Sequence, residues 1–373
     1  MLPLIIVSIF VTVSYILLLT SLIIGWKRIN KFEKGSENPF PIFISVIISA
    51  KNEENNISQT LNSLLYQTLN SNSFEVLIID DFSSDNTNNI IKEFCKQQSS
   101  FQLLSLNEHK GKKFALDYGI KKAKGELIVT TDADCEFQAE WLQTIKDYYI
   151  SSNAKMIIAP VLIKSKSWFE HMQALDFFSL MISGAAATGI KRPIMNNGAN
   201  LAFSKEAYLG LNDPTKQDIS SGDDIFLLLK MKEEYPSKIH FLKSKKAIVY
   251  TKPKESFTAY INQRKRWASK SKHYHNFDII YTAVSVLLIN TLLLTSLIYG
   301  SYQSDLFFVF LCVFTFKSIF DFIFLYKTIH FFQQKPILKY FLFVQFANVF
   351  LIPFLAFSGI FTKTKWKEKL IDK

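Results

Sequence analysis

Four long apolar segments constrain the fold of this chain more than any other feature of its sequence. One lies at residues 2–24, and the others lie at residues 279–300, 306–326 and 340–361. Each is long enough to cross the hydrocarbon core of a bilayer as a helix, for which about 20 residues suffice. We therefore expect a membrane protein in which the more polar region, residues 39–274, forms a globular domain flanked by transmembrane helices.

The first apolar segment is interpreted as a retained anchor, residues 1–26, and not as a cleaved signal peptide. No basic region precedes it, its apolar run is too long, and no A-x-A cleavage site follows it. The residues directly after it are basic: Lys27, Arg28, Lys31 and Lys34. Because cytoplasmic flanks carry an excess of Lys and Arg, we expect a multi-pass protein of the cell membrane (inner or plasma) whose catalytic domain is cytoplasmic.

The C-terminal region, residues 277–363, is predicted to contain two to three spans, followed by a basic tail at 364–373. Three spans would place the tail outside the cell, whereas its lysines favour the cytoplasm, so one segment could be re-entrant or interfacial. Lys317 and Asp321 lie four residues apart in the second segment. They are predicted to neutralise each other on a helix face that points into the bundle, with a substrate path as the alternative.

Short β-rich runs alternate with helical patterns throughout the first part of the polar region. The runs expected to form strands are residues 44–49, 74–79, 103–106 and 126–131. This alternation predicts an α/β domain with a mostly parallel sheet. In such sheets ligands bind at the carboxyl ends of the strands, so the polar residues that follow each run are candidates for a single pocket. Residues 168–187 predict a long apolar helix that lies either in the core or in the membrane interface.

The formal net charge of +11 favours an anionic membrane or an anionic substrate as the partner. The sequence has no zinc-finger spacing and no nucleic-acid-binding signature, so we expect no nucleic-acid partner. The cysteines, Cys95, Cys135 and Cys312, are far apart and odd in number, which argues against a disulfide framework. Cys135 is interpreted as a small neutral neighbour of two carboxylates and not as a nucleophile.

Paired carboxylates follow two of the expected strands. Asp132 and Asp134 come at the end of the fourth run, where two carboxylates one residue apart can bind Mg²⁺ or Mn²⁺. Acidic triplets are also common on protein surfaces, which is the alternative reading. Asp80 and Asp81 close the second run, where a buried carboxylate needs hydrogen-bond donors such as those of uracil or ribose. Their alternative role is to cap the next helix.

A third acidic pair, Asp223 and Asp224, follows Gly222 at the start of an amphipathic helix. Asp224 is the candidate general base that takes a proton from an acceptor hydroxyl, with Asp223 as its neighbour. An acidic residue at this position is equally expected as a helix cap.

A cationic and aromatic motif occupies residues 263–267, close to the next apolar segment. Its spacing places Gln263, Arg266 and Trp267 on one side of a helix. Arg266 could bind a pyrophosphate through two hydrogen bonds, and Trp267 offers a flat platform for a sugar ring. The alternative is a basic cluster attracted to anionic lipid.

Two further segments carry weaker signals. The basic segment 110–113, which includes Lys112, either approaches a phosphate or is solvated, and it lacks the spacing of a P-loop. Residues 196–200, Asn-Asn-Gly-Ala-Asn, either orient an acceptor or form a plain turn.

Together these motifs resemble those of the family 2 glycosyltransferases, the inverting group that contains cellulose, chitin, hyaluronan and poly-N-acetylglucosamine synthases. The resemblance covers about residues 44–267. It assigns to donor binding the strand-end residues, the basic residue of segment 110–113 and the helical motif: Ala50, Asn52, Glu53, Asp80, Asp81, Lys112, Asp132, Gln263, Arg266 and Trp267. Asp132 and Asp134 match the family's DxD metal motif. The Gly-Asp-Asp at 222–224 departs from the Thr-Glu-Asp or Glu-Asp pattern usual in processive members, although it keeps the final Asp.

The resemblance implies a GT-A fold and a membrane-bound inverting glycosyltransferase that uses a nucleotide-diphosphate sugar, expected to be UDP-linked, with Mg²⁺ or Mn²⁺. It implies a saccharide or lipid-linked acceptor, and processive polysaccharide synthesis is one outcome. Two alternatives stay open. A non-processive enzyme would transfer a single sugar to a lipid phosphate or glycolipid, and a non-catalytic binding or transport component would retain the fold without the chemistry.

Overall fold

The structure is a computed structural model that describes residues 2–33, 41–106, 111–217, 219, 222–361, 364–366 and 369–371. The chain divides into two compact units. The sheet unit consists of Ile29–Lys164 and Met195–Lys252, and the helical unit consists of Met1–Arg28, Ser165–Ile194 and Pro253–Lys373. Each unit is described by itself.

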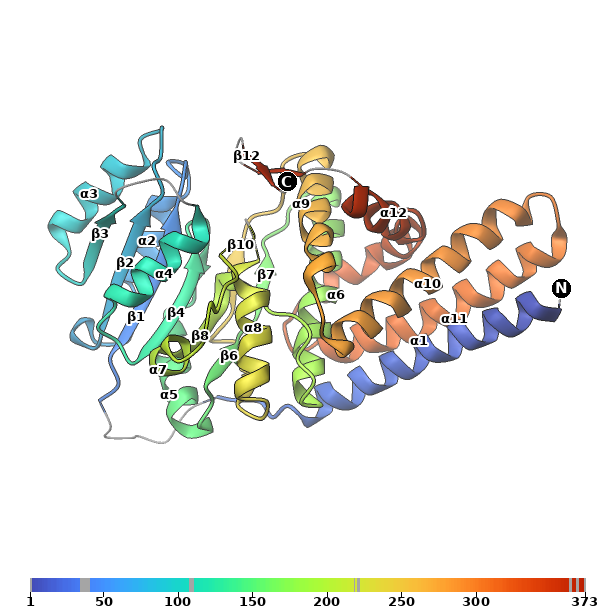
Figure 1. Cartoon of the computed structure of the whole chain (residues 1–373), viewed down its shortest axis with the longest axis horizontal. Helices are drawn as coiled ribbons and strands as arrows, with labels where there is room; N and C mark the ends of the chain where they lie inside the picture. The colour runs from blue at the N-terminus through green and yellow to red at the C-terminus, as the bar shows by residue number, and fades with distance from the viewer. Residues whose placement is uncertain are drawn as a thin grey trace. The chain divides into compact units, whose positions relative to one another are not determined.

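The sheet unit is built on a seven-stranded sheet in the order β3-β2-β1-β4-β8-β6-β9 (Figure 1). Its first four strands in this order are parallel: β3 (Phe101–Ser105), β2 (Phe74–Asp80), β1 (Ile44–Ala50) and β4 (Leu127–Asp132). Its other three strands are short: β8 (Leu201–Ser204), β6 (Met156–Ile158) and β9 (Ile239–Phe241). β8 runs antiparallel to both β4 and β6, whereas β6 and β9 are parallel.

The parallel strands end together because their pairing is in register at the carboxyl edge. Ala50 of β1 pairs with Asp80 of β2, and Ser49 of β1 pairs with Asp132 of β4. All of β2 is buried, and β1 is buried except for a half-buried Ser49. Continuous apolar runs of this kind are typical of parallel strands that are covered on both faces. The predicted α/β fold with a mostly parallel sheet is therefore confirmed.

Six helices and a small second sheet complete the described part of the sheet unit. The helices are α2 (Ile57–Leu65), α3 (Thr87–Gln97), α4 (Lys112–Lys122), α5 (Trp141–Ser152), α7 (Lys205–Leu209) and α8 (Asp223–Glu234). The second sheet has the order β5 (Glu136–Phe137), β10 (Val249–Thr251) and β7 (Val161–Ile163). Short 3₁₀ turns lie at Ser71–Ser73 and Gly198–Asn200.

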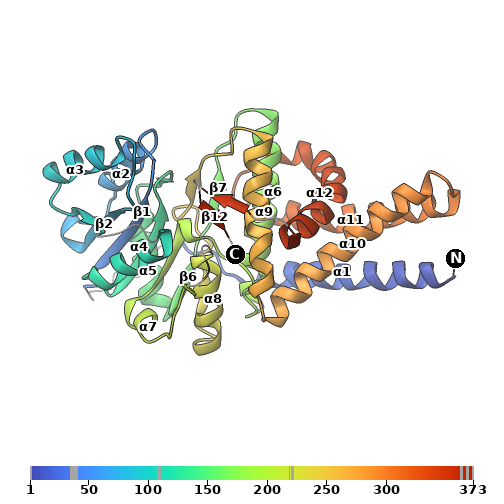
Figure 2. The ribbon, with the colours of Figure 1, turned by 45° about the horizontal axis from the view of Figure 1, so that its top comes forward.

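The helical unit contains the long apolar helices. Its elements are α1 (Leu2–Arg28), α6 (Trp168–Gly189), α9 (Phe257–Ser269), α10 (Phe277–Gly300), α11 (Ser304–Ile329), α12 (Phe341–Phe361), the 3₁₀ segments Lys270–His273 and Lys335–Tyr340, and the hairpin β11 (Thr364–Trp366)–β12 (Lys369–Ile371). α1, α10 and α11 run side by side (Figures 1 and 2). Residues 168–187, for which core and interface were both open, belong to α6, which packs on α1.

Four helices of the described chain are long and apolar enough to cross a membrane: Ile5–Arg28, Phe277–Gly300, Ser304–Ile329 and Lys335–Ser358. They coincide with the four segments predicted from the sequence, and they are those of a membrane protein. The number of crossings and the side on which each unit lies stay predictions.

The first of these helices approaches α6 backbone to backbone. A Cβ atom added at Gly25 of α1 would lie 2.0 Å from the carbonyl oxygen of Ala186 on α6. Real Cβ atoms do not approach a backbone atom so closely, so this crossing requires glycine. Its closeness makes α1 a packed element of the helical unit.

A buried polar cluster joins α1, α11 and α12. Lys317 Nζ lies 2.7 Å from Asp321 Oδ2 and 2.6 Å from Gln345 Oε1. Asp321 also accepts from the Tyr15 hydroxyl at 2.7 Å and from Gln345 Nε2 at 2.6 Å. The four side chains are all buried. The predicted pairing of Lys317 with Asp321 inside the helix bundle is confirmed.

Candidate active site at the ends of the parallel strands

Two loops at the carboxyl edge of the sheet are tied to each other. Asn52 follows β1 in a left-handed conformation with φ 52°, and its Oδ1 accepts from the amide of Ser84 at 2.9 Å. The amide of Glu53 donates to Thr87 Oγ1 at 2.7 Å. Asn is one of the few residues other than glycine that adopt a positive φ. The segment after β1, predicted to begin a nucleotide site, is therefore held against the segment after β2.

Asp80 and Asp81 lie at this edge, as predicted, and both are buried. Asp80 Oδ1 accepts from the Ser83 hydroxyl at 2.5 Å, and its Oδ2 accepts from Asn88 Nδ2 at 3.0 Å. The amide of Asp81 donates to the carbonyl of Ala50 at 2.8 Å. Asp80 thus orders the loop after β2. Its hydrogen-bond donors come from its own chain, whereas the sequence predicted that a ligand would supply them.

Asp85 receives two hydrogen bonds from the first residue of α3. Its Oδ1 accepts from the amide of Thr87 at 3.0 Å and from the Thr87 hydroxyl at 2.6 Å. The capping alternative for the earlier pair is therefore unnecessary, and Asp80 and Asp81 remain candidates for nucleotide binding.

Asp132 and Asp134 present carboxylates just beyond β4, and the Asp132 side chain is 37% exposed. Among the described residues no group of three His, Cys, Asp or Glu side chains forms a preformed metal cage. Two carboxylates nevertheless fit Mg²⁺ or Mn²⁺, because these ions prefer oxygen ligands and commonly complete their shell with water and phosphate oxygens. The donor set therefore suits a metal that arrives with a diphosphate.

The surroundings of the neighbouring thiol disfavour its thiolate form. Burial, together with the negative charges of Asp132 and Asp134, raises the pKa of Cys135 well above its usual value. The Cys135 Sγ lies 3.7 Å from Asp134 Oδ1. Because only a thiolate is reactive, the interpretation of Cys135 as a neutral neighbour agrees with this environment.

The third acidic pair begins α8. Gly222 precedes the pair with φ 86°, a left-handed backbone conformation that residues other than glycine rarely adopt. This conformation turns the chain into the helix. Asp224 Oδ2 accepts from the amide of Gly198 at 3.3 Å, and its backbone carbonyl accepts from Asn196 Nδ2 at 3.0 Å. Asp224 is therefore fixed against residues 196–198 as well as starting the helix.

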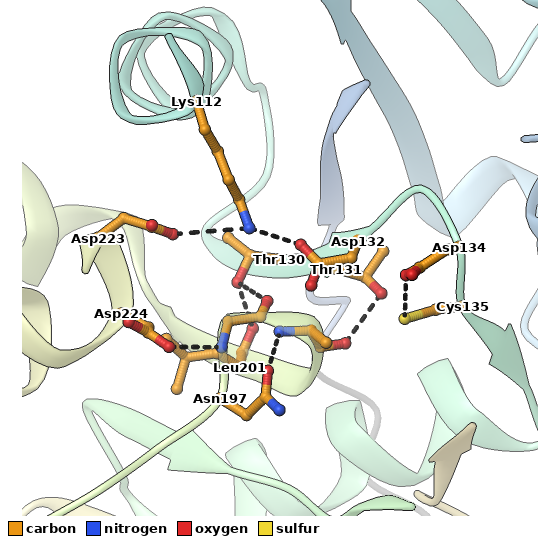
Figure 3. A network of polar contacts seen from close by, with 12 residues as sticks. Lys112, Thr130, Thr131, Asp132, Asp134, Cys135, Asn197, Leu201, Asp223 and Asp224 are labelled. Atoms are coloured by element: carbon orange, nitrogen blue, oxygen red, sulfur yellow. Dashed lines mark hydrogen bonds and ion pairs between the residues drawn. The ribbon is translucent and has the colours of Figure 1, made fainter. Parts of the chain in front are cut away.

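The turn that holds Asp224 is itself fixed to β4. The hydroxyl of Thr130 donates to the carbonyl of Gly198 at 3.0 Å, and that of Thr131 donates to the carbonyl of Ala199 at 2.9 Å. Figure 3 shows this turn between the end of β4 and Asp224. Residues 196–200 therefore connect the strand that ends in the candidate metal motif to the candidate base, so they do more than form a plain turn.

Lys112 lies among the carboxylates. Its Nζ is 2.5 Å from Asp132 Oδ1 and 4.0 Å from Asp223 Oδ2, and Figure 3 shows the ammonium reaching between them. Burial by itself lowers the pKa of Lys112, but the charges of Asp132, Asp223 and Asp224 outweigh it and raise the pKa above its usual value. The predicted phosphate ligand is thus a permanent cation inside the acidic cluster, while Lys110 lies outside the described residues.

Lys113 was not singled out from the sequence, yet it anchors a loop of the site. Its buried Nζ donates to the carbonyls of Thr215 at 2.6 Å and Lys216 at 2.8 Å, and it lies 4.7 Å from the centre of the Phe226 ring. The missed signal is periodic, because Lys113 continues the apolar face formed by Leu116 and Ile120. A lysine on such a face needs buried acceptors.

The motif at 263–267 lies on α9 of the helical unit. Gln263, Arg266 and Trp267 are half-buried there, and the Trp267 ring lies 6.2 Å from that of Phe177 on α6. The contact of these three side chains with a donor stays a prediction. The motif's most buried residue is Arg264, which the sequence pattern did not single out. It pairs with Asp176 and lies 4.8 Å from the centre of the Trp267 ring.

Comparison with known proteins adds an independent line of evidence. The protein-family model named Glycosyl transferase family 2 matches residues 45–207. A second family model, named Glycosyl transferase family group 2, matches residues 127–357, which is more than half of the chain. A poly-beta-1,6-N-acetyl-D-glucosamine synthase of Staphylococcus epidermidis is 41% identical over 91 residues, which is 24% of this chain and 21% of that protein. A beta-monoglucosyldiacylglycerol synthase of Trichormus variabilis is 32% identical over 117 residues, 31% of this chain and 25% of that protein.

A solved structure shares the fold. The mannosyltransferase PcManGT from Pyrobaculum calidifontis, in complex with GDP-Man and Mn²⁺, aligns with a TM-score of 0.57 over 95% of this chain and 99% of its own, at 16% identity. The chain thus matches a GT-A type transferase along its length in fold, whereas its sequence matches span only a quarter or less of the two curated relatives.

Proposed function

The chain belongs to the family 2 glycosyltransferases, and on that premise we propose that it moves a sugar from a UDP-linked donor to a saccharide or lipid-linked acceptor, with inversion at the anomeric carbon. The observation that carries this proposal is the joining of a DxD carboxylate, a lysine and a candidate base. Lys112 lies 2.5 Å from Asp132 and 4.0 Å from Asp223, and Asp224 is fixed by the turn that is bonded to β4.

The donor's nucleoside is proposed to bind at the ends of β1 and β2. Ala50, Asn52 and Glu53 lie on the first of these segments, which is hydrogen-bonded to the second. Asp81 is only 2% exposed, and a buried carboxylate is suited to the N–H and hydroxyl donors of uridine. Because the loops are already bonded to each other, little ordering of the chain would oppose binding.

The diphosphate is proposed to bind beside β4. Asp132 and Asp134 would hold Mg²⁺ or Mn²⁺, which supplies positive charge to the departing diphosphate. Lys112 adds a cation from α4 at the same carboxylate. Roles for Gln263 and Arg266 at the pyrophosphate, and for Trp267 as a platform for a sugar ring, rest on the resemblance of residues 263–267 to the family's motif alone.

Asp224 is proposed to take the proton from the acceptor hydroxyl. As the acceptor oxygen bonds to the anomeric carbon, the bond from that carbon to the diphosphate oxygen breaks, and the hydroxyl proton passes to a carboxylate oxygen of Asp224. The amide of Gly198 donates to Asp224 Oδ2, which fixes the orientation of this carboxylate. One displacement from the opposite face inverts the anomeric centre.

The acceptor separates two candidate activities. One relative is named for a polysaccharide and another for a glycolipid, so products of both classes have support. The four apolar helices support a reaction at a membrane. We propose the cell membrane, with the sheet unit in the cytoplasm, because the basic residues Lys27 and Arg28 end α1.

The test is turnover of a panel of UDP-sugars by the full chain in nanodiscs, with Mg²⁺ or Mn²⁺. We expect metal-dependent release of UDP that falls by roughly 10² to 10⁴ in Asp224→Asn. The matched control is Glu234→Gln, which removes the same charge from the exposed far end of the same helix, α8. Long products indicate a polymerase, and single additions indicate a lipid-linked transferase.

Two results would contradict parts of this proposal. If Asp224→Asn released UDP as fast as the wild type, another group would be the base. UDP binding without turnover of any sugar, in the presence of membrane lipids and oligosaccharide acceptors, would favour a non-catalytic binding or transport component.

A further inference from the structure

One of the two carboxylates that would hold a metal, that of Asp132, already pairs with a cation of the chain itself. We propose that Lys112 is an internal counter-ion that opposes metal binding until a nucleotide diphosphate arrives, so that donor and metal enter the site as one unit. The inference deepens the proposed function and rests on it only in the choice of UDP as the nucleotide.

The first support is the position of the ammonium. Its Nζ lies 2.5 Å from Asp132 Oδ1, the first carboxylate of the DxD motif, and 4.0 Å from Asp223 Oδ2. Figure 3 shows Lys112 entering from α4 on one side of the cluster while the acids come from β4 and α8. Asp132 thus has its neutralising charge without any metal.

The second support is the fixed origin of this side chain. Lys112 is the first residue of α4, and the next residue is bonded to two carbonyls of the 211–217 segment. Asp117, a turn further along α4, accepts from the Tyr208 hydroxyl at 3.1 Å. The backbone of Lys112 is therefore anchored, and only its flexible four-carbon stem is left to move the charge.

The third support is charge balance. Lys112, Asp132, Asp223 and Asp224 together carry one positive and three negative charges. A divalent ion bound to Asp132 at the usual distance of about 2.1 Å would share that carboxylate with the ammonium, and like charges at this range repel strongly in a partly buried site. Metal binding alone must therefore displace Lys112 from its partner.

A diphosphate removes this conflict. Its oxygens offer Lys112 a new anionic partner and offer the metal further oxygen ligands, so both cations gain when the nucleotide is present. By linkage, if the nucleotide increases the affinity for the metal by some factor, the metal increases the affinity for the nucleotide by the same factor. Lys112 would enlarge this mutual effect by weakening the binding of metal alone.

The test measures Mn²⁺ binding to the full chain in nanodiscs, by electron paramagnetic resonance of the free ion, with and without UDP. In the wild type, UDP is expected to tighten Mn²⁺ binding by at least about tenfold. In Lys112→Met, Mn²⁺ alone is expected to bind on the order of tenfold more tightly than in the wild type, while the enhancement by UDP shrinks. Lys112→Arg keeps the charge and is expected to keep the weak binding of metal alone.

The matched control is Lys122→Met, which removes the same charge from the exposed end of the same helix. Equal Mn²⁺ affinity in Lys112→Met and Lys122→Met would overturn the inference. So would a wild type that binds Mn²⁺ as tightly without UDP as with it, a result that requires no variant to fold. Absence of UDP binding at any metal concentration would instead contradict the proposed donor, and Mn²⁺ binding without nucleotide would still decide the role of Lys112.

Discussion

The buried guanidinium of Arg264 on α9 forms an ion pair with the half-buried carboxylate of Asp176 on α6. The Tyr260 hydroxyl donates to the same carboxylate at 2.6 Å, and the guanidinium lies 4.8 Å from the centre of the Trp267 ring. The pair therefore joins the helix that carries the cationic-aromatic motif to the longest helix of the helical unit that is not a candidate span. Arg264 positions Trp267 and is not itself proposed to touch the donor.

Removal of this cation is expected to destabilise the helical unit. Arg264→Met would leave the half-buried Asp176 without its cation, and we expect a loss of up to about 3 kcal/mol, the lower end of the cost of breaking a buried ion pair. Although burial lowers the pKa of Arg264 to about 9, the guanidinium is charged at neutral pH, so the full pair is lost. Thermal unfolding in detergent checks the loss, and Arg264→Lys is expected to recover part of it. An unfolding midpoint no lower than that of the exposed-site variant Lys272→Met would contradict this role.

Lys113 is expected to act on turnover through the loop that it anchors. Lys113→Met would leave the carbonyls of Thr215 and Lys216 without a donor, at a cost of about 1–3 kcal/mol for each buried group that stays unpaired. The 211–217 segment would loosen, and kcat should fall more than KM for the donor rises. The measurement is steady-state kinetics beside Lys122→Met, and equal kcat in the two variants would refute the positioning role.

The buried polar cluster of Tyr15, Lys317, Asp321 and Gln345 is expected to behave as a coupled unit. Lys317→Met or Asp321→Leu alone would strand a buried charge, and each is expected to cost about 3–5 kcal/mol. The double variant removes both charges, so it should be more stable than either single variant, although Tyr15 and Gln345 each lose a partner. A double-mutant cycle on thermal stability measures the coupling, and additive losses would mean that the two residues act independently.

Metal removal is expected to stop the reaction without unfolding the protein. Asp132 already has Lys112 as a counter-charge, so the fold does not depend on a bound ion. Chelation should therefore abolish UDP release while the unfolding temperature stays unchanged, and added Mn²⁺ should restore turnover. Asp134→Ala is expected to need more Mn²⁺ for the same rate. Full activity in excess chelator would rule out the metal assignment.

The strand-end residues could be predicted because their signal is local. The buried runs that form β1, β2 and β4 are continuous in the sequence, and Asp80 and Asp132 close two of them. Parallel strands share a carboxyl edge, so the meeting of these acids follows from the pattern alone. The long apolar helices were predictable for the same reason, since length and composition define them.

The missed parts depend on contacts between distant segments. Arg264 and Asp176 are 88 positions apart, and nothing local to either residue marks the other as its partner. The strands β6, β8 and β9 have three or four residues each, which is too short for a period to be recognised. The position of Lys112 between Asp132 and Asp223 likewise depends on three elements, β4, α4 and α8, meeting in the fold.

The close crossing at Gly25 has a consequence for how α1 can be treated. An anchor is commonly regarded as interchangeable, because any apolar helix of suitable length will hold a protein in a bilayer. Here the backbone of Ala186 fills the place of a side chain at position 25, Trp26 packs on Phe331 and Phe332, and the Tyr15 hydroxyl binds Asp321. A foreign transmembrane segment of equal hydropathy would restore attachment to the membrane. It would not restore the contacts by which α1 packs against the rest of the helical unit.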